Sequence, residues 1–338
     1  MPRTFLHATD HAYKNCGGIL ISIIILNWNG KKDTIDCLES LEKVEYDSFK
    51  IYLVDNGSTD DSVEVIQKQF PKVELVETGK NLGFAGGNNA ALRQVLKTNT
   101  DYIFLLNNDT VVNPGILDAF VQRAKKEPRT AWGAKLFLYD LPDTLDHLGG
   151  IWDEKQAFFR LVGNRKRDDG SAFPDPIELD YICGAALFVP KKAFEEVGLL
   201  DERFFLIWEE ADWCMRAKRA GFKMRLCPEA KLFHKVSASF QGKAHHAYFS
   251  WRNRLLFIEK NFSGKARRKY MKQILFREAI IKYKHLQLRR ITRRLGIVLR
   301  QDKPHRKEKI QKNRAILRGI RDYVFRRFGD APKTLYKK

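Results

Sequence analysis

The chain has 338 residues, 44% of them hydrophobic and 12% aromatic, so it can fill a core of its own and is not a disordered polypeptide. Its formal net charge is +20, but residues 260–338 alone hold 27 Lys and Arg against 5 Asp and Glu, while the other 259 residues hold 34 against 36. The basic character therefore belongs to a C-terminal tail, which excludes a protein that is basic throughout and predicts one large domain plus an appendage.

The cysteine content and the first residues bear on the compartment. Five cysteines without any C-x-x-C pair are typical of a reducing compartment and of free, mostly buried thiols. The first twenty residues carry charged and histidine side chains without an apolar core, unlike a signal peptide, and no uncharged run approaches the roughly 18 residues of a membrane-spanning helix. We therefore expect a cytoplasmic protein in which residues 1–18 form a loose extension. The cysteines are Cys16, Cys37, Cys183, Cys214 and Cys227.

The first part of the chain alternates between apolar runs and amphipathic stretches. Four apolar runs predict buried strands at 19–26, 51–54, 73–76 and 102–106. Between and after them the pattern predicts helices that end near residues 43, 70, 97 and 125. Strands and helices in alternation with short polar links indicate an α/β fold, a doubly wound, mostly parallel sheet with helices on both faces.

Beyond Trp132 the alternation becomes weaker. Residues 140–176 are rich in Asp, Gly and Pro, and we expect them to form a long excursion that carries a β-hairpin. A strand is predicted at 181–189, followed by a helix that ends near Gly198. A further helix is predicted at 209–220, with glycine as its C-terminal stop.

Each early strand ends in a cluster of Asn, Asp and Gly, and right-handed crossovers place those ends along one edge, where open α/β sheets bind ligands. Asp55 ends the second strand and can accept hydrogen bonds from a base or a ribose hydroxyl, although a ligand-free turn explains it equally well. Asn107, Asn108 and Asp109 end the fourth strand, and their oxygen ligands suit a hard ion such as Mg²⁺ or Mn²⁺. They are also ordinary turn formers ahead of Pro114.

Two other features carry a weaker signal. Gly83, Phe84 and Asn88 open a helix whose backbone N–H groups could face a phosphate or a ribose, but the glycine spacing is not G-x-G-x-x-G. Close helix packing explains these glycines better when the loop is judged alone. His234 follows an apolar pair and could add a nitrogen ligand to a metal, although such a histidine is more often a core residue.

Glu209, Glu210 and Asp212 place three acids in the first turn of the predicted helix at 209–220. Interaction with the helix dipole alone would favour acids there. A carboxylate in this position could also act as a general base toward an attacking hydroxyl. The neighbouring aromatic residues fit either a sugar-stacking surface or a buried helix start.

The order and spacing of these motifs are more informative than any one of them. Between about residues 20 and 260 the chain carries, in this order, IIILNWNG, VDNGSTD, NLGFAGGNN, LLNNDT, CGAALFVP and DERFFLIWEEADWCMRAKRAG, and then a histidine. This series resembles glycosyltransferase family 2, and within it the rhamnosyltransferase-like branch. The resemblance implies a GT-A fold and an inverting, metal-dependent transfer from a nucleoside-diphosphate sugar, dTDP-rhamnose or a UDP-sugar, to a lipid-linked or growing glycan of the cell surface. The rival function is that of a non-catalytic nucleotide-sugar-binding scaffold.

The resemblance also implies a donor site at the strand ends. Asp55 would bind the nucleoside base, with Asn27 beside it at the end of the first strand. The remaining donor-site residues would be Gly83, Phe84, Asn88 and Asn108.

The same resemblance also implies which residues bind the metal ion and which residue is the catalytic base. Asp109 corresponds to the last acid of the family's metal motif, and His234 corresponds to the histidine that often joins it, with Mg²⁺ or Mn²⁺ as the ion. The family's catalytic base lies in a Glu-Asp pair, whereas this chain has Glu209-Glu210. Glu210 stands at the base position, and the choice between it and Glu209 stays open.

The division of the chain predicts an α/β domain over 19–260 and a basic, amphipathic helical tail over 261–338. Polybasic amphipathic helices typically bind anionic membrane surfaces, so we expect peripheral attachment at the inner face of the cell membrane. A solvated helical face is the plainer explanation, and nucleic acid is the least favoured partner. The identity of the sugar and the acceptor should depend on the loops at 140–176 and around 251–254.

Overall fold

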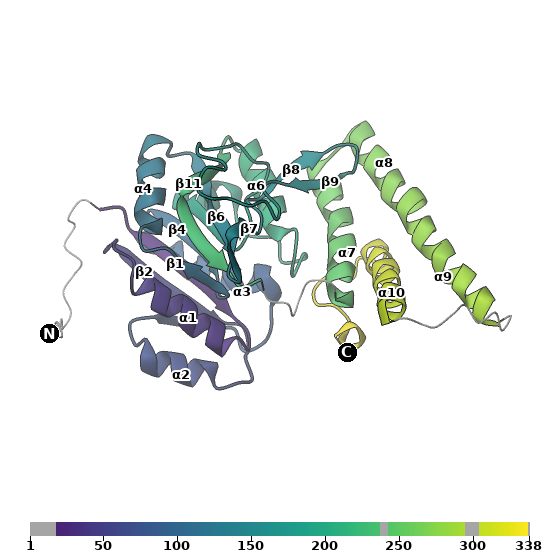
Figure 1. Ribbon diagram of the computed structural model, residues 1–338, viewed down its shortest axis with the longest axis horizontal. Coiled ribbons are helices and arrows are strands. Elements are labelled where there is room, and N and C mark those ends of the chain that lie inside the picture. Colours follow the sequence, from purple (N-terminus) through teal and green to yellow (C-terminus); the bar gives the residue numbers. More distant parts are fainter. Residues whose placement is uncertain (1–17, 237–242, 295–303, 337–338) are drawn as a thin grey trace.

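A computed structural model describes residues 18–236, 243–294 and 304–336. Within these residues a central sheet of nine strands is covered by helices on both faces, and a group of helices stands to one side of it (Figure 1). The predicted α/β architecture is confirmed. The predicted N-terminal extension lies outside the described residues, except for its last position.

The first half of the sheet is parallel, in the order β3-β2-β1-β4. Side chains alternate between its two faces, so that Ile23 and Ile25 pack toward α1 and α4, whereas Ile24 packs toward α3. The strands are β1 (Ile21–Asn27), β2 (Phe49–Asp55), β3 (Glu74–Glu77) and β4 (Tyr102–Asn107), and the helices are α1 (Lys31–Leu41), α2 (Ser62–Gln69), α3 (Gly83–Val95) and α4 (Ile116–Lys126).

The second half makes the sheet mixed. β10 lies antiparallel between β4 and β6, while β11 runs parallel to β6 and antiparallel to β5. The prediction of a mostly parallel sheet therefore holds for the first half, whereas in the second half β6 and β11 are the one parallel pair among the described strands. The added strands are β5 (Thr110–Val112), β6 (Thr130–Leu138), β7 (Leu141–Leu145), β10 (Ala186–Pro190) and β11 (Lys223–His234).

The predicted strands need additions and one corrected boundary. β5, β6, β7 and β11 were not predicted. β6 is buried along its whole length, but Gly133 and Lys135 interrupt its apolar residues, so it shows neither a uniform apolar run nor an alternation. The strand predicted at 181–189 begins only at Ala186, because Cys183 and Ala186 close a turn with a backbone hydrogen bond of 3.1 Å. The predicted hairpin within 140–176 is confirmed as β8 (Gly150–Asp153) and β9 (Phe158–Leu161).

The helices that follow connect the sheet to a helical layer beside it. Residues 251–254, predicted to be a loop, lie in the middle of α7 and are largely buried, so that prediction is wrong. The elements are α5 (Lys191–Val197), α6 (Glu209–Arg219), α7 (Ala244–Asn261), α8 (Gly264–Lys272), the π-helical turn η1 (Gln273–Glu278), α9 (Ala279–Arg294), α10 (Pro304–Val324) and the 3₁₀ turn η2 (Lys333–Leu335).

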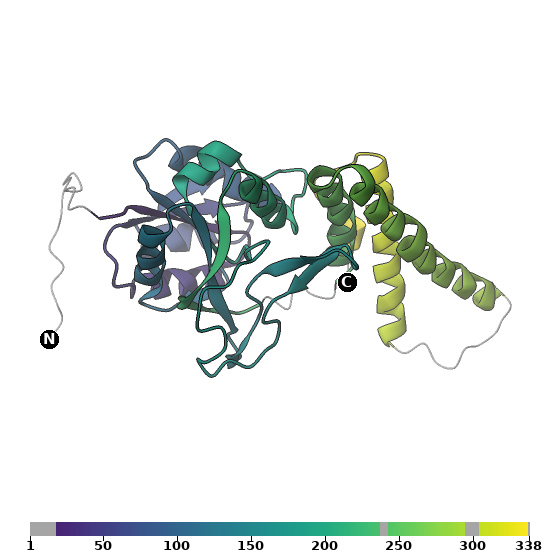
Figure 2. The ribbon, with the colours of Figure 1, turned by 90° about the horizontal axis from the view of Figure 1, so that it is seen from above.

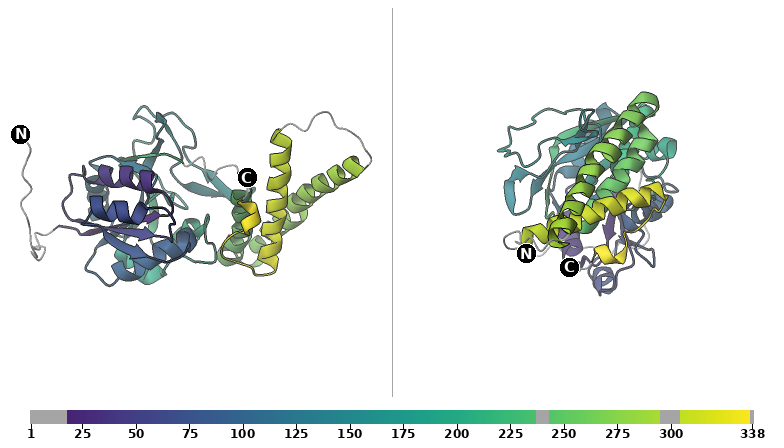
Figure 3. Two further views of the ribbon diagram at one scale, coloured as in Figure 1. Left: turned by 90° about the horizontal axis from the view of Figure 1, so that it is seen from below. Right: turned by 90° about the vertical axis from the view of Figure 1, so that its right-hand side faces the viewer.

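Contacts on two sides hold α7. α10 runs along it so closely that a Cβ on Gly319 would lie 2.5 Å from the Tyr248 carbonyl oxygen. From the other side the hairpin β8–β9 reaches over, and the Trp152 ring packs against Phe257 and Phe262. From the end of α7, α8, η1 and α9 continue as one long rod that leaves the sheet (Figure 2), and α9 and α10 diverge as two arms (Figure 3). No helix among the described residues is long and apolar enough to cross a membrane.

Candidate active site

The ends of β1 and β2 meet at the carboxyl edge of the sheet, where Asn27 and Asp55 are register partners. Asn27 Nδ2 donates to Asp55 Oδ1 at 3.3 Å and to Ser62 Oγ at 3.0 Å, and Asn27 Oδ1 accepts from Thr34 Oγ1 at 2.9 Å. The other carboxylate oxygen of Asp55 accepts from the Ser58 backbone N–H at 3.1 Å. The two predicted residues are thus brought together, and Asn27 fixes the orientation of the Asp55 carboxylate.

Asn56 is a residue that the sequence analysis missed. Its buried Nδ2 donates to the Gly83 carbonyl oxygen at 3.2 Å and to Asn81 Oδ1 at 3.1 Å, and its Oδ1 accepts from the Leu82 N–H at 2.9 Å. It therefore ties the end of β2 to the start of α3. Its only sequence signal was its place after Asp55.

At the start of α3, Gly83 has φ +72°, and a Cβ there would lie 2.3 Å from the Phe205 carbonyl oxygen. Only glycine fits this combination of backbone and contact. The buried Asn88 donates through Nδ2 to the Phe84 carbonyl oxygen at 2.9 Å, so its amide is bonded within the helix. Phe84 is half-buried, and a Cβ on Gly184 would lie 3.5 Å from its ring tip.

Asn107, Asn108 and Asp109 lie at the end of β4, as predicted. Asn108 Nδ2 donates to Thr34 Oγ1 at 2.9 Å, which turns its amide toward α1. A Cβ on Gly30 would lie 2.6 Å from that nitrogen, so the turn after β1 and the turn after β4 are in direct contact.

The pairing of β5 with β11 brings His234 opposite Thr110 and so next to Asp109. His234 Nε2 lies 3.2 Å from Asp109 Oδ1, and His234 Nδ1 lies 3.0 Å from Asp146 Oδ2. All three side chains are at most 15% exposed. The structure therefore joins the two predicted metal ligands and adds Asp146, which sequence analysis missed. Asp146 opens the segment DHLGG in a stretch without periodicity, and only its position before a glycine pair could have marked it.

Burial lowers the pKa of His234, but the hydrogen bonds that its ring donates to Asp109 and Asp146 more than offset this and raise the pKa to about 10. In the absence of a metal ion, the imidazole is therefore a cation between two carboxylates. The Asp146 carboxylate also fixes which ring nitrogen faces Asp109.

This arrangement fits a divalent ion. Two ligands at right angles on an ion with bonds of roughly 2.1 Å would lie about 3 Å apart, close to the separation of the Asp109 and His234 atoms. A carboxylate on the second ring nitrogen, as Asp146 provides, is the usual support of a metal-binding histidine. Across residues 18–236, 243–294 and 304–336, no three His, Cys, Asp or Glu side chains converge on a common point, so the protein would supply an incomplete ligand set.

Glu209 and Glu210 begin α6 but lie in different surroundings. Glu209 is buried, whereas Glu210 is partly exposed, and in each side chain the Oε2 atom is buried without a hydrogen-bond partner. Burial, and next the neighbouring Glu210 charge, raises the pKa of Glu209 well above its usual range. Burial also raises the pKa of Glu210, with partial compensation by backbone N–H groups of the helix start and by His147.

His147 and Cys183 connect the two parts of the site. The Gly149 N–H donates to His147 Nδ1 at 3.3 Å, so the proton of the neutral ring sits on Nε2, which lies 3.6 Å from Cys183 Sγ. Burial lowers the pKa of His147. The next residue after Cys183 is Gly184, where a Cβ would lie 3.5 Å from Glu210 Cγ. Glu210 therefore stands on the same edge as the Asp109–His234–Asp146 group.

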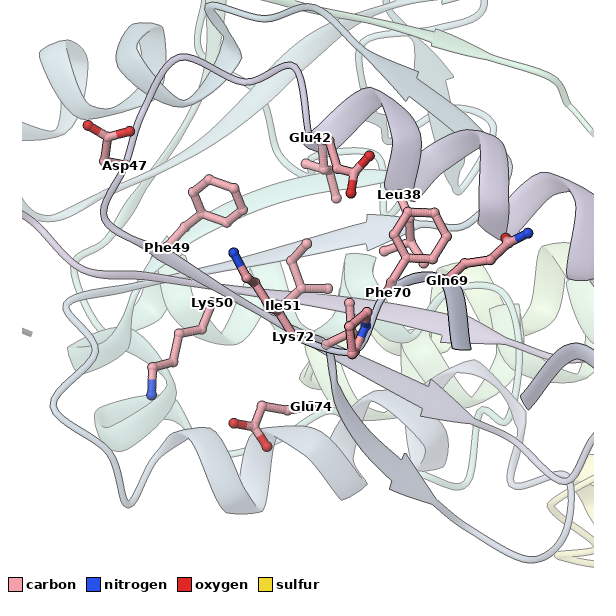
Figure 4. A pocket seen from close by; sticks show the side chains of 13 residues that line it. Leu38, Glu42, Asp47, Phe49, Lys50, Ile51, Gln69, Phe70, Lys72 and Glu74 are labelled. Carbon is pink, nitrogen blue, oxygen red and sulfur yellow. The ribbon is translucent and has the colours of Figure 1, made fainter. Parts of the chain in front are cut away.

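A separate hollow of about 1000 Å³ lies at the opposite edge, near the amino ends of β2 and β3 (Figure 4). Phe49, Ile51 and Phe70 line it together with the acids Glu42 and Glu74. None of the predicted site residues belongs to its described walls. The candidate active site is therefore the carboxyl edge and not this hollow.

Comparison with known proteins finds a family model and several similar glycosyltransferases. The family model "Glycosyl transferase family 2" matches residues 22–198. An N-acetylglucosaminyl-diphospho-decaprenol L-rhamnosyltransferase of Mycobacterium tuberculosis is 27% identical over 252 residues, which cover 67% of this chain and 80% of that protein. A dTDP-rhamnosyl transferase of Shigella flexneri, RfbF, is 21% identical over 257 residues, covering 71% and 80%.

Among solved structures, the mannosyltransferase PcManGT from Pyrobaculum calidifontis, in complex with GDP-Man and Mn²⁺, superposes with a TM-score of 0.54 at 12% identity. The superposition covers 90% of this chain and 87% of that one. At this identity the likeness concerns the fold alone, and it confirms the predicted GT-A architecture.

Proposed function

This chain belongs to glycosyl transferase family 2, and on that premise we propose that it is an inverting, divalent-metal-dependent hexosyltransferase. Its donor would be dTDP-rhamnose or a UDP-sugar, and its acceptor a hydroxyl of a lipid-linked or growing cell-surface glycan. The names of the two relatives support this choice, because one transfers rhamnose to a diphospho-decaprenol-linked sugar and the other is a dTDP-rhamnosyl transferase. Both are transferases, which argues against the non-catalytic scaffold.

The observation that carries the proposal is the placement of two carboxylate groups of different kind on one edge of the sheet. Asp109, with His234 held by Asp146, offers ligands to a metal–diphosphate. Glu210 stands nearby with a carboxylate oxygen that lacks a partner. In the proposed transfer, the ion held by the first group would stabilise the leaving diphosphate, and the second group would accept the proton of the attacking hydroxyl.

On the donor side, Asp55 is proposed to accept hydrogen bonds from the nucleoside. Its carboxylate is oriented by Asn27 and the Ser58 N–H, which leaves it fixed before a ligand arrives. Phe84, Gly83 and the residues at the start of α3 would form the adjoining wall. Asn88 and Asn108 are bonded to Phe84 and Thr34, so their proposed contribution is to the shape of this wall.

Mg²⁺ or Mn²⁺ would be held by Asp109 and His234, with diphosphate oxygens completing the ligand set. When bound there, such an ion would neutralise charge on the departing diphosphate. The chain's own part is to hold the two ligand atoms 3.2 Å apart and to keep His234 in one tautomer through Asp146.

Glu210 is proposed as the base. The acceptor oxygen bonds to the anomeric carbon as the bond from that carbon to the diphosphate oxygen breaks, with inversion. The bonding electrons leave with the nucleoside diphosphate, and the hydroxyl proton passes to the Glu210 carboxylate. A raised pKa makes Glu210 a stronger base than an exposed glutamate.

Glu210 is favoured over Glu209 because of its surroundings. Glu209 is 3% exposed, which keeps it away from an acceptor, and burial raises its pKa well above the usual range of a glutamate. Glu210 is partly exposed and lies beside Gly184, facing the same space as Phe84. Of the two glutamates, only Glu210 is partly exposed, so it is the one that an acceptor hydroxyl could approach.

The test is a transfer assay of the full chain with dTDP-, UDP- and GDP-sugars and a polyprenyl-diphosphate-linked acceptor. We expect turnover with one donor, a product of inverted anomeric configuration by NMR, and loss of turnover to background on chelation, restored by Mn²⁺. Asp109→Asn should behave like the chelated enzyme. A chelated enzyme at full activity would refute the metal, and absence of turnover with every donor would refute the donor class.

We also propose that the tail segment binds the anionic membrane surface, which would place the protein peripherally on the inner face of the cell membrane. Large apolar side chains are exposed on η1 and α9 between basic ones, as a surface-binding helix requires. The predicted boundary between the α/β domain (19–260) and the tail (261–338) stays a proposal. α10 belongs to the predicted tail but is packed on α7, which lies almost entirely in the predicted domain. The exposed residues are Phe276, Ile280, Ile281 and Tyr283, and the bases among them are Arg277, Lys282 and Lys284.

Flotation of the full chain with vesicles tests this attachment. We expect binding to vesicles that contain phosphatidylserine and none to pure phosphatidylcholine vesicles, with weaker binding after Phe276→Ser and Ile281→Ser. Recovery with neither vesicle type would leave a solvated helical face as the explanation, and equal recovery with both would refute the preference for an anionic surface.

A further inference from the structure

The backbone just before Glu209 is held in an unfavourable conformation. Phe205, Ile207 and Trp208 have φ of 65°, 67° and 80°, in the left-handed region that residues with a Cβ seldom occupy. Such a run persists only when its surroundings hold it in place. Residues 203–208 are called the base loop below, because they lead directly into the proposed base.

One buried amide on α7 bonds to three carbonyl oxygens of the base loop. Asn253 Nδ2 donates to the carbonyl oxygens of Phe204, Leu206 and Ile207, each at 2.8 Å. The Asn253 amide has two N–H hydrogens, which the three carbonyl oxygens share. All three carbonyl groups must therefore point toward Asn253 Nδ2. The left-handed backbone at Phe205, Ile207 and Trp208 turns neighbouring carbonyl groups of the loop toward Asn253.

Arg252 fixes the orientation of that amide. Its Nε donates to Asn253 Oδ1 at 2.9 Å, which leaves Asn253 Nδ2 facing the loop. Its Nη2 donates to the Phe204 carbonyl oxygen at 2.8 Å, and its Nη1 donates to the Gly329 carbonyl oxygen at 2.5 Å. Arg252 is fully buried, so these bonds are shielded from water.

The other side of the base loop touches the start of α3, where Gly83 and Phe84 form the proposed wall of the donor site, called the donor wall below. The Phe205 carbonyl oxygen accepts from the Ala85 N–H at 3.3 Å and is the atom that excludes a Cβ from Gly83. The loop therefore lies between the start of α3 and α7, and its next residues are Glu209 and Glu210. Its position sets where the base stands relative to the donor wall.

We propose that Asn253, oriented by Arg252, is a positioning residue for sugar transfer, acting through the base loop on Glu210. The inference rests on the proposed role of Glu210 as the base. Asn253 does not line the site itself. Its contacts with the loop are to backbone atoms, so it would hold the loop in place whatever side chains the loop carries. Its effect should fall on the chemical step and not on donor binding.

The test compares Asn253→Ala and the isosteric Asn253→Asp, which lacks N–H donors, with Asn261→Ala. Asn261 is on the same helix and donates through Nδ2 to Asp212 Oδ1 and to the Phe257 carbonyl oxygen, but it does not contact the base loop. Misplacement of a catalytic group by about 1 Å costs roughly 100-fold. We expect kcat to fall by about that factor in both Asn253 variants with the donor KM within about two-fold, and Asn261→Ala to stay near wild type.

Hydrogen exchange provides a readout that does not depend on activity. The amides of Phe204, Phe205 and Leu206 bond within or next to the loop, and they should exchange faster in the Asn253 variants than in Asn261→Ala. Unchanged exchange, or a fall in kcat matched by an equal rise in donor KM, would overturn the proposal. If Glu210→Gln transfers sugar like wild type, the assignment of the base fails. Faster loop exchange in the Asn253 variants would still establish that Asn253 holds the base loop.

Discussion

The two halves of the sheet bring residues to the same edge by different routes. In β3-β2-β1-β4, parallel strands joined by helices present each polar turn directly after a buried strand, so Asn27 and Asp55 meet through strand register. In the half built from β10, β6, β11 and β5, His234 reaches Asp109 through antiparallel pairing, and its support Asp146 lies 88 residues away along the chain. The proposed donor side is thus formed by turns that directly follow predictable strands. The proposed catalytic side depends on contacts between segments that lie far apart in the sequence.

This difference has a consequence for mutations. Substitutions of Asn27 and Asp55, in the parallel half, should change mostly the binding of the donor, because these two side chains sit on a preformed edge. Substitutions in the mixed half should change the rate of the chemical step, because that half supplies the base and the support of the metal ligand. Four experiments test this division, from the largest expected effect to the smallest.

Glu210→Gln should reduce transfer by roughly 10²–10⁴-fold, the usual contribution of a positioned general base. Donor affinity, measured by calorimetry with the nucleoside diphosphate and Mn²⁺, should stay near wild type. Glu209→Gln is the matched control and should lose less than about ten-fold. Equal losses in the two variants would contradict the choice between these neighbours.

Asp146→Asn keeps the size of the side chain but weakens its hold on His234 Nδ1. Loss of such a support typically costs roughly 10–100-fold in metal affinity or activity. Titration of activity with Mn²⁺ should therefore give a half-saturation point shifted upward by that factor. A variant with wild-type metal dependence would mean that Asp146 has only a packing role.

Asp55→Asn tests the parallel half. It places an N–H donor against the Asn27 amide or the Ser58 N–H, and it removes the negative charge offered to the nucleoside. We expect the donor KM to rise about ten-fold, in line with the loss of one hydrogen bond to a charged group, with kcat changed only a few-fold. A large fall in kcat at unchanged KM would break the proposed division between the halves.

The pH dependence should show the raised pKa of Glu210. A base works when deprotonated, so kcat/KM should fall as the pH drops through that pKa. The acid limb should therefore lie above about 4.3, the value of an exposed glutamate. It should be absent from the residual activity of Glu210→Gln. A wild-type profile that stays flat down to about pH 4.3 would contradict a buried base at this position.

The sequence was sufficient for the parallel half of the fold, because its buried strands are uniform apolar runs with turn residues at their ends. The position of Asp55 and Asp109 at open strand ends follows from the rule that such ends share one edge, and the family resemblance implied Asn27 beside Asp55. The family resemblance added the contact between Asp109 and His234, which the structure confirms as a contact at 3.2 Å. Their chemical roles remain predictions.

The rest could not be predicted because its cause is tertiary. β6 is buried along its whole length and includes Lys135, whose charge is paired with Asp168, so its pattern does not resemble a strand with one exposed face. Asp146 lies in an aperiodic stretch. Asn253 is a polar residue in the interior of a helix, and its importance arises only from three carbonyl groups of another segment.

The contact between Arg252 and the Gly329 carbonyl has a consequence for the order in which the protein assembles. Every strand of the sheet precedes residue 235, so the sheet can form while later residues are still being synthesised. The base loop, in contrast, obtains its last support only when residues up to Gly329 have emerged and α10 has packed on α7. We therefore expect a nascent chain that binds the nucleotide before it can transfer sugar.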